Sequence, residues 1–300
     1  MARPIPVVLD TDIGSDVDDT WALAFLLRCP ELDLRYVNAS TDNTVYRARL
    51  AARTLELAGR TDVPVGVGVA SKSEDWSDFQ EPYVEGYALS DYPGTVVQDG
   101  EAGMIETIMS SDEPMTVLAI GPLTSVAEAL RREPAIARRA ARFVGMQGSI
   151  YYREMRAAGP SKEYNVVRDV DAARTVFDAG WDTTITPLDT CGCLVLDEPH
   201  MSALRASTDP LVRGVIQCHD LYCTKIKSLT PHASSILYDT VAVYLAFATE
   251  LLLLEDMKLR VTDDGITAPD ADGNMTHVAT NWRDMHAFKE LLVARLHATD

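Results

Sequence analysis

The sequence has few basic residues for its length. It contains 27 lysines and arginines against 45 aspartates and glutamates, and its formal net charge is −18 at pH 7. A nucleic-acid binder needs a basic surface that displaces the counterions of the phosphates, and an acidic chain is also repelled by anionic membrane surfaces. We therefore expect neither nucleic acid nor a membrane as a partner. A small neutral ligand or a cation is compatible with this charge.

Cysteines and long apolar runs are also scarce. The five cysteines are an odd number and form no pair of CxxC motifs, and Cys191 and Cys193 flank a single glycine, a spacing too tight for a usual structural zinc site. No run reaches the roughly 18 apolar residues that span a membrane, and the opening segment MARPIPVVLD lacks the apolar centre of a secretion signal. These absences predict reduced thiols in a cytoplasmic protein.

Length and composition predict one large domain. The chain has 300 residues, of which 47% are hydrophobic and 7% aromatic, which allows a sizeable buried core. It contains no fixed-period repeat, no low-complexity segment and no linker that would divide it, so we expect a single domain over residues 1–300. Two long loop-like stretches, Ser71–Gly94 and Ile150–Lys162, are expected to be functional or mobile.

Short apolar segments alternate with helix-like segments through the first two thirds of the chain. The β-branched run Pro6–Leu9 is typical of a buried strand, the Ala/Leu-rich segment Thr20–Leu27 is typical of a buried helix, and Gly59 is placed to end a second helix. Further strands are expected at Leu32–Val37, Val65–Val69, Met115–Ile120, Phe143–Met146 and Thr183–Pro187, and further helices at Arg47–Ala58, Met104–Met109, Thr124–Arg131 and Asp171–Ala179. This alternation predicts an α/β fold with a mainly parallel central sheet flanked by helices on both faces.

The last third of the chain follows a different pattern. The segment Pro199–Ala248 is mostly helix-like, and strands are expected near Lys258–Val261 and His277–Thr280. A final helix is expected to begin at Trp282 with Asn281 as its N-cap. The buried side of this helix would carry Met285, Phe288, Leu292 and Leu296.

The segment Asp10–Asp19 carries the strongest chemical signal. Its sequence, DTDIGSDVDD, places five carboxylates in ten residues between a buried strand and a buried helix. Like charges this close raise each other's pKa values unless a cation neutralises them. Ca²⁺ and Mg²⁺ bind carboxylate, carbonyl and water oxygens, and open α/β sheets bind ligands at the carboxyl ends of their strands. The segment therefore predicts a divalent-cation site. The alternative is a solvated acidic loop in which Asp18 or Asp19 caps the helix.

Several segments, in order, resemble a known enzyme family. DTDIGSDVDDTWAL is similar to the N-terminal signature of the inosine–uridine-preferring nucleoside hydrolases, in its longer form with an extra xD before the DD pair. Four later segments resemble the further blocks of that family, in the same order: VNASTDNTVYRARLAARTLELAGRTDVPVGVG, AIGPLTSVAEAL, GMQG with KEYNVVRDVDAA, and SSILYDTVAVYLA. The resemblance implies the Rossmann-like nucleoside hydrolase fold and calcium-dependent hydrolysis of the N-glycosidic bond of a ribonucleoside to free base and ribose. It also implies a role in purine or pyrimidine salvage and a homodimer or homotetramer.

The same resemblance assigns the metal and the attacking water. Ca²⁺ would be bound by Asp12, Asp19, Asp239 and the backbone carbonyl of Ile120. Because a bound cation acidifies a water molecule, Asp12 beside it is the candidate general base. Taken alone, the Ile120 carbonyl could belong to an ordinary strand-ending turn at Gly121, and Asp239 could be only the N-cap of a helix.

A second group of residues is implied to hold the substrate. The positions of the family's ribose contacts are occupied here by Asp18, Asn43, Met146, Glu163, Asn165 and Asp239. In an extended segment Glu163 and Asn165, two residues apart, would face the same side. The alternatives are that these two residues cap a helix expected near Val170, and that Met146 is a plain core residue.

The base-binding side departs from the family pattern. Tyr238 stands where many relatives have a histidine that contacts or protonates the leaving base, and Glu85 stands at the place of their loop histidine. The asparagine of their glycine-rich loop has no clear counterpart, since Ala157 or Ala158 occupies that place. Tyr238 and Glu85 are therefore the candidates for the acid that assists departure of the base. Three further roles stay open, those of Asp16, His219 and His232.

Two other functions fit parts of the sequence. A strand followed by DxD also describes the nucleophile loop of haloacid-dehalogenase-type phosphatases, with Asp10 as the nucleophile, but it leaves the DD pair and the later segments unexplained. A non-catalytic nucleoside- or ribose-binding relative would explain the missing histidines. Release of base and ribose, release of inorganic phosphate, or binding alone separates the three.

Overall fold

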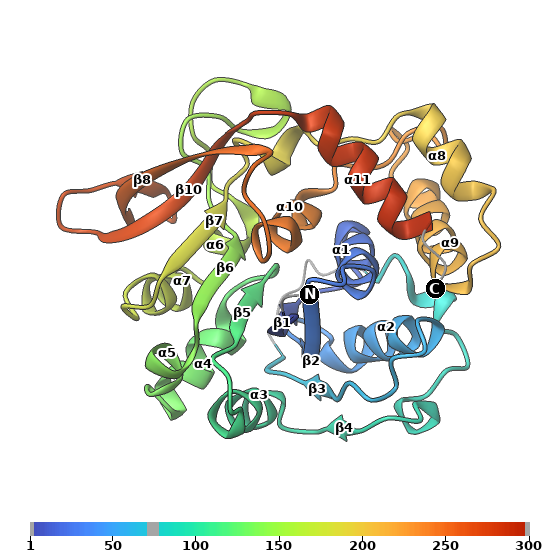
Figure 1. Cartoon of the computed structure of the whole chain (residues 1–300), viewed down its shortest axis with the longest axis horizontal. Coiled ribbons are helices and arrows are strands. Elements are labelled where there is room, and N and C mark those ends of the chain that lie inside the picture. The colour runs from blue at the N-terminus through green and yellow to red at the C-terminus, as the bar shows by residue number, and fades with distance from the viewer. Residues whose placement is uncertain (1–2, 71–77, 298–300) are drawn as a thin grey trace.

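The strands of the described residues, 3–70 and 78–297 of this computed structural model, form one sheet (Figure 1). They are β1 (Ile5–Thr11), β2 (Leu32–Ala39), β3 (Val65–Val67), β4 (Val96–Val97), β5 (Thr116–Ala119), β6 (Arg142–Met146), β7 (Thr183–Thr186), β8 (Leu252–Val261), β9 (Thr267–Pro269) and β10 (Asn274–Trp282). Their order in the sheet is β4-β3-β2-β1-β5-β6-β7-β10-β8-β9. All pairs from β4 to β10 are parallel, and β8 pairs antiparallel with β10 and β9. The predicted mainly parallel sheet is confirmed.

Helices cover both faces of this sheet. They are α1 (Asp18–Leu27), α2 (Thr44–Leu57), α3 (Gly100–Ser110), α4 (Thr124–Arg132), α5 (Ile136–Arg139), α6 (Tyr164–Val167), α7 (Val170–Phe177), α8 (Glu198–Arg205), α9 (Pro210–Lys225), α10 (Tyr238–Leu245) and α11 (Met285–His297). One apolar cluster includes residues of α1, α2, α8, α9, α10 and α11, and a second includes residues of α3, α4, α5 and α7. Figure 1 shows α3, α4, α5 and α7 on the opposite side of the sheet from α1, α2 and α9. The predicted α/β architecture is therefore observed.

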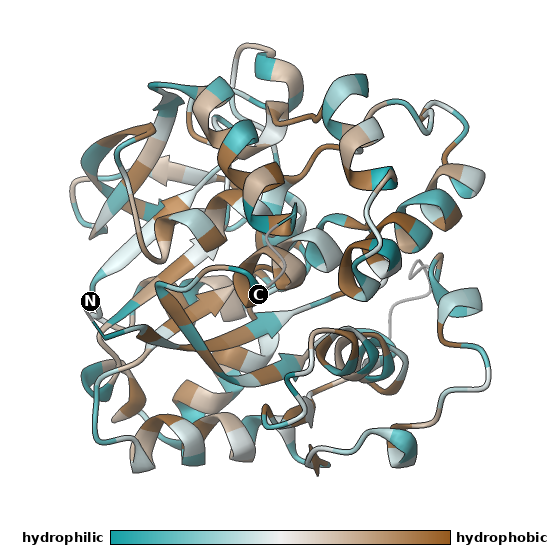
Figure 2. Cartoon of the chain, turned by 45° about the vertical axis from the view of Figure 1, so that its right-hand side comes forward, coloured by the Kyte–Doolittle hydropathy of each residue, from teal (hydrophilic) through white to brown (hydrophobic). Residues whose placement is uncertain are grey.

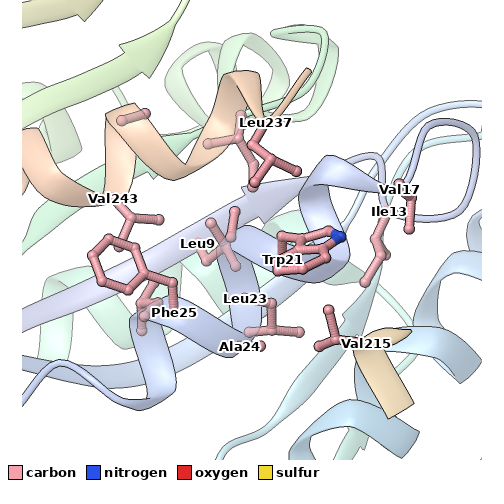
Figure 3. Packing of buried hydrophobic residues seen from close by; sticks show 14 of the residues in the cluster. Leu9, Ile13, Val17, Trp21, Leu23, Ala24, Phe25, Val215, Leu237 and Val243 are labelled. Atoms are coloured by element: carbon pink, nitrogen blue, oxygen red, sulfur yellow. The ribbon is translucent and has the colours of Figure 1, made fainter. Parts of the chain in front are cut away.

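The strand β1 and the helix α1 form the centre of the larger cluster. Val7 and Leu9 belong to it, whereas Val8, pointing the other way, belongs to the cluster on the opposite face, as the period of a strand requires. Leu9, Trp21 of α1 and Leu237 lie together in this packing (Figure 3). The central strands β1 and β5 are mostly apolar, whereas β7 and β10 are mostly polar. The helices also carry hydrophilic residues (Figure 2). Burial of α1 explains its Ala/Leu-rich sequence, and its packing fixes the residues that follow β1.

The predicted final helix begins at the wrong residue. Trp282 is the last residue of β10, where it pairs with Leu252, and its indole Nε1 donates a hydrogen bond to a backbone carbonyl at 2.9 Å. The helix α11 starts at Met285, and Asp284 rather than Asn281 accepts a hydrogen bond from its first turn. Strand pairing extends past the polar cluster at Asn281, and a single sequence does not reveal that pairing. The expected burial holds for Phe288, Leu292 and Leu296, whereas Met285 is half-buried.

The two long loops contain short ordered pieces. Within Ser71–Gly94, residues 71–77 lie outside the described part, and the remainder contains the 3₁₀ turns η1 (Glu81–Tyr83) and η2 (Leu89–Asp91). Within Ile150–Lys162 lies η3 (Glu154–Arg156). The start of this second loop is fixed by the buried carboxylate of Asp189, which accepts hydrogen bonds from three consecutive backbone N–H groups. In the described ranges, no helix is long and apolar enough to cross a membrane.

Candidate active site

The carboxyl end of β1 lies where the order of strands reverses. Successive strands run outward to β2 on one side of β1 and to β5 on the other, and this is the usual place for a ligand in an open α/β sheet. Asp12 is the first residue after β1, and Asp18 and Asp19 begin α1. The N-cap of α1 is Val17, so neither Asp18 nor Asp19 caps the helix. Both lie in its first turn, where the helix dipole favours negative charge.

A cavity of about 290 Å³ lies at this edge of the sheet. We call its buried lining residues the floor and its exposed or half-buried lining residues the rim. The floor consists of Asp12, Asp18, Asp19, Ile120, Met146, Glu163, Asn165, Leu188 and Asp239. The rim consists of Ser15, Asp16, Glu154, Tyr164 and Tyr238. None of the described lining residues is basic, so the cavity is strongly acidic.

Buried carboxylates crowd one part of the floor. Ligand oxygens of Asp18, Asp19 and Asp239 lie within 4.8 Å of one another. Burial and then neighbouring carboxylates raise the pKa of Asp18 to about 8, and the same two causes hold the pKa values of Asp19 and Asp239 well above their usual range. Burial raises the pKa of Asp12 to about 6, although the Arg47 guanidinium opposes this rise. Without a counter-charge this cluster resists ionisation.

Arg47 of α2 places a buried cation behind Asp12. Its Nη1 lies 3.9 Å from Asp12 Oδ2, and its side chain is 1% exposed. Its Nη2 donates to Ser15 Oγ at 2.9 Å and to Asp42 Oδ2 at 3.2 Å, and its Nε donates to the Thr41 carbonyl at 3.0 Å. Thr41 and Asp42 both have positive φ angles, of 61° and 51°. Arg47 therefore fixes a left-handed turn beside the floor, a role that its place in a helix-like sequence did not suggest.

Glu163 and Asn165 connect the parts of the floor. Glu163 is the N-cap of α6, and its carboxylate accepts hydrogen bonds from the N–H groups of Asn165 at 2.7 Å and Gly148 at 3.0 Å. Burial raises the pKa of Glu163 to about 7. The Asn165 Nδ2 donates to the carbonyls of Ile120 at 3.1 Å and Met146 at 3.0 Å. Asn165 thus ties the ends of β5 and β6 together beneath the cavity.

The helix-capping alternatives are realised only in part. Glu163 does cap a helix, but that helix is α6 and its side chain lines the cavity as well. The helix that begins at Val170 is capped by Asp169. Asp239 lies in the first turn of α10, whose N-cap is Leu237, so it is not a cap. Glu163 and Asp239 therefore both lie in the floor, and Asp239 is part of the crowded carboxylate cluster.

The turn after β5 touches Asp12. A Cβ atom on Gly121 would lie 2.7 Å from Asp12 Oδ1 and 2.9 Å from the Asp12 nitrogen, so only glycine fits there. The Gln147 side chain donates to the Gly121 carbonyl at 3.1 Å and holds the turn. The Ile120 carbonyl accepts from Asn165, and because a carbonyl oxygen has two lone pairs it can bind a second partner.

Two predicted site residues lie away from the cavity. Asn43 is exposed, and its side-chain oxygen caps α2 by accepting from the Tyr46 N–H at 3.2 Å. Glu85 is exposed just after η1. Neither residue is among those that line the cavity, so the ribose contact at Asn43 and the acid at Glu85 stay predictions. The polar run around Asn43 offered several candidates, and the backbone turn turns Asp42, not Asn43, inward.

The two histidines whose roles were open also lie outside the cavity lining. His219 is fully buried, with its ring edge toward Trp21 and its Nε2 3.3 Å from Cys223 Sγ. Burial lowers the pKa of His219 to about 4, so the ring is neutral near pH 7. His232 is exposed, with its Nδ1 3.4 Å from a carboxylate oxygen of Glu198. Of Tyr238 and Glu85, the two candidates for the acid that assists the leaving base, Tyr238 lines the cavity and Glu85 does not.

Several lining residues escaped the sequence analysis. Glu154 comes from the long loop 150–162, whose length was the one signal for it. Asp16 belongs to the acidic segment, which predicts its place near the site but not its role. Ser15 and Tyr164 lie inside the segments DTDIGSDVDD and KEYNVVRDVDAA, although neither is an expected site residue there, whereas Leu188 has no sequence signal.

Asp10 points away from the cavity. It is fully buried, and its carboxylate accepts hydrogen bonds from Asn38 Nδ2 at 2.7 Å and Ser40 Oγ at 3.1 Å. Burial raises the pKa of Asp10 to about 8. Since it is not among the lining residues, it cannot attack a substrate in the cavity. The phosphatase alternative therefore loses its nucleophile.

The floor suits a hard divalent cation. Its donor atoms are carboxylate and carbonyl oxygens, the ligands that Ca²⁺ and Mg²⁺ prefer, and the repulsion within the buried cluster is the kind that a cation offsets. Asp18, Asp19 and Asp239 are the three carboxylates whose ligand oxygens lie within 4.8 Å of one another. Asp12 lines the same floor and acts electrostatically on Asp19 and Asp239. The acidic cluster can thus bind a metal ion.

Known proteins match most of this chain. The model of the family described as inosine-uridine preferring nucleoside hydrolase matches residues 7–292. The pyrimidine-specific ribonucleoside hydrolase RihA of Enterobacter sp. (strain 638) is 30% identical over 230 residues, covering 73% of this chain and 71% of its own. A plant nucleoside hydrolase, PpNRh1, superimposes with a TM-score of 0.83 at 23% identity, covering 99% of this chain and 100% of its own. The purine-preferring ribonucleoside hydrolase of Gardnerella vaginalis gives a TM-score of 0.79 at 22% identity, over 97% and 98% of the two chains.

Together with the fold and the acidic cavity, these matches define the protein as a hydrolase that acts on N-glycosyl bonds. It belongs to the inosine-uridine preferring nucleoside hydrolase family. The names of its relatives cover pyrimidine-specific and purine-preferring enzymes, so membership leaves the nucleobase open.

Proposed function

We propose that this chain hydrolyses the N-glycosidic bond of a ribonucleoside to free base and ribose, in a calcium-dependent reaction at the floor of the cavity. The observation that carries the proposal is the buried, carboxylate-lined floor at the end of β1 in a member of this family. A neutral nucleoside also suits the acidic cavity, because a phosphorylated substrate would be repelled by it.

The proposed Ca²⁺ ligands are Asp12, Asp19, Asp239 and the Ile120 carbonyl, with Asp18 close enough to join them. Bound there, the ion would lower the pKa of a coordinated water and offset the charge of the cluster. The donor set supports this assignment, since it consists of oxygens alone.

Asp12 is the proposed general base. It accepts one proton from the attacking water, whose oxygen forms the new bond to C1′ of the ribose. The bond from C1′ to the base nitrogen breaks, its electron pair leaves with the base, and the base takes up a proton from solvent while Asp12 releases its proton to solvent. Because this passes through a ribosyl cation, the surrounding carboxylates also stabilise the transition state electrostatically.

The remaining floor residues are proposed to hold the ribose. Asp18, Glu163 and Asn165 supply polar groups, and Met146 supplies an apolar surface. Support comes from their common place in the floor and from the hydrogen bonds that fix Glu163 and Asn165. Asp239 is proposed to bind both the ion and a ribose hydroxyl.

Departure of the base has weak assistance from the protein. Burial and the nearby Asp18 carboxylate raise the pKa of Tyr238 above its usual value, so its hydroxyl can donate a hydrogen bond but is a poor acid. This favours substrates whose base leaves readily. The weak assistance to the leaving base is also compatible with a second candidate function, that of a non-catalytic nucleoside-binding relative.

A panel of ribonucleosides, assayed for free base by chromatography and for ribose by its reducing end, tests the proposal. We expect both products in equal amounts, with loss of turnover after chelation of calcium and recovery on its return. Nucleoside binding without any release of base would establish the non-catalytic alternative. Release of inorganic phosphate from phosphomonoesters would instead support the phosphatase alternative.

A cytoplasmic location, a role in nucleoside salvage and assembly as a homodimer or homotetramer are proposals of the same kind. The free state of all five cysteines supports a reducing compartment. Size-exclusion chromatography with light scattering tests the assembly.

A further inference from the structure

Asp16 is a rim residue that the proposed reaction does not use. It lies in the loop between β1 and α1, and its side chain is exposed at the opening of the cavity. Its Oδ1 accepts a hydrogen bond from the Tyr222 hydroxyl at 2.8 Å, and its backbone carbonyl accepts from Gln80 Nε2 at 2.8 Å. Side chain and backbone are therefore both fixed, which is unusual for an exposed carboxylate.

Tyr222 and Gln80, the two residues that donate hydrogen bonds to Asp16, are themselves fixed by their neighbours. Tyr222 is buried in α9, and its ring packs against Phe79 with 5.8 Å between centroids. Gln80 is fully buried, and its N–H donates to the Tyr46 hydroxyl of α2 at 3.0 Å. The position of Asp16 thus depends on α2, α9 and the segment before η1. A carboxylate fixed in advance loses little entropy when it binds a ligand.

The second carboxylate oxygen of Asp16 is available to a ligand. Tyr222 uses Oδ1, and among the described residues no group donates a hydrogen bond to Oδ2. An ionised carboxylate only accepts hydrogen bonds, so Oδ2 recognises an N–H or O–H donor. No described basic side chain forms an ion pair with Asp16. Arg47, the buried cation near the floor, donates to Ser15 instead.

The base of a bound nucleoside would project toward this oxygen. If the floor holds the ribose, the base attached to C1′ extends to the rim. Asp16, Glu154 and Tyr238 all line the rim of the same cavity. Glu154 differs from Asp16 because no described residue donates a hydrogen bond to its carboxylate. It is therefore a control of equal charge without fixed geometry.

We infer that Asp16, oriented by Tyr222, is a specificity-determining residue that selects ribonucleosides whose base presents an exocyclic amino group to the rim. The inference rests on the proposed hydrolysis and names the substrate class for it. Cytidine and adenosine present such a donor, whereas uridine and inosine carry a carbonyl oxygen at the same position. A carboxylate accepts from the amino group and repels the carbonyl oxygen.

The test compares kcat/KM for cytidine against uridine and for adenosine against inosine, in the wild-type chain and in variants. In Asp16→Asn, one oxygen can still accept from Tyr222 while an NH₂ group replaces Oδ2 as a donor. We expect the amino-to-carbonyl ratio to fall by about tenfold in the pair that binds with this edge at the rim, the effect of one specific hydrogen bond. The intrinsic leaving ability of each base is the same for every variant, so the change in the ratio reports the contact alone.

Matched variants separate recognition from charge and from folding. Glu154→Gln removes one rim charge as well and should leave the ratios within about twofold of wild type, because that carboxylate is not fixed. Tyr222→Phe should move the ratio in the same direction as Asp16→Asn, with thermal unfolding measured beside it. Ratios unchanged in Asp16→Asn for both pairs, or moved equally by Glu154→Gln, would overturn the inference while hydrolysis by the wild type still stands. Absence of base release from all four nucleosides would overturn the proposed function and this inference with it.

Discussion

At the scale of single residues, the site depends on buried carboxylates whose charges are not balanced by basic side chains. Asp18, Asp19 and Asp239 crowd together, while Asp12 has Arg47 at 3.9 Å behind it. The crowded carboxylates attract a cation, and Asp12, which is proposed to bind that cation with Asp19 and Asp239, stays ionised nearer to neutral pH and can also act as the base.

Asp12→Asn should remove the general base with almost no change of shape. We expect kcat to fall by about 10²–10⁴-fold, the usual contribution of general base catalysis. Thermal stability should change little, since the substitution also removes a buried charge from an acidic cluster. Steady-state kinetics and calorimetry measure both quantities, with Asp171→Asn on the exposed first turn of α7 as the control. A variant that keeps activity within tenfold of wild type would refute the role of Asp12.

Tyr238→Phe tests how the base leaves. The raised pKa of Tyr238 makes its hydroxyl a hydrogen-bond donor rather than an effective acid. Activated aryl ribosides should therefore be cleaved much faster than inosine by the wild type, and the substitution should slow inosine more than the activated substrate. Equal losses on both substrates would show that Tyr238 only packs or positions.

At the scale of elements, the functional groups come from turns that follow the strands. Most strands and helices were predictable, because short β-branched runs alternate with longer helical ones, and the acidic segment identified the working edge of the sheet. The sequence did not reveal that Asn43 and Glu85 are exposed, or that Arg47 is buried close to Asp12. Such placements depend on turn geometry and on contacts between distant segments, for which one sequence has no periodic signal.

Gly121→Ala tests the turn between β5 and α4. The added methyl group would lie 2.7 Å from Asp12 Oδ1, so it must displace the carboxylate. We expect a loss of at least about tenfold in kcat/KM, since small misplacements of reacting groups are costly. Gly180→Ala is the control, because its φ of 76° strains an added side chain although no atom lies within 4 Å. The control should lose about 1 kcal/mol of stability and keep its kinetics. Equal values of kcat/KM in both variants would show that this turn does not position Asp12 for catalysis.

At the scale of the whole molecule, the acidic cavity makes stability depend on pH and on calcium. Burial raises the pKa of Asp10 from 3.8 to about 8 and that of Glu163 from 4.5 to about 7. At a pH between the unfolded and the folded pKa of each group, the folded chain binds more protons than the unfolded chain. The free energy of unfolding therefore falls as pH rises. We expect this fall between about pH 5 and pH 8 in a chelator and a smaller fall in calcium, which favours the folded, ionised state. Urea unfolding at three pH values measures it, and a stability that rises with pH in the chelator would contradict the account.

The most direct measurement is a crystal structure with Ca²⁺ and a C-nucleoside, whose base is attached through carbon and is not cleaved. The account predicts one Ca²⁺ bound by Asp12, Asp19, Asp239 and the Ile120 carbonyl, with oxygen distances of about 2.3–2.6 Å. It also predicts the ribose against the floor and the base at the rim. A cation bound elsewhere, or a nucleoside that leaves this cavity empty, would contradict the central claim that one acidic site holds both the metal and the reacting bond.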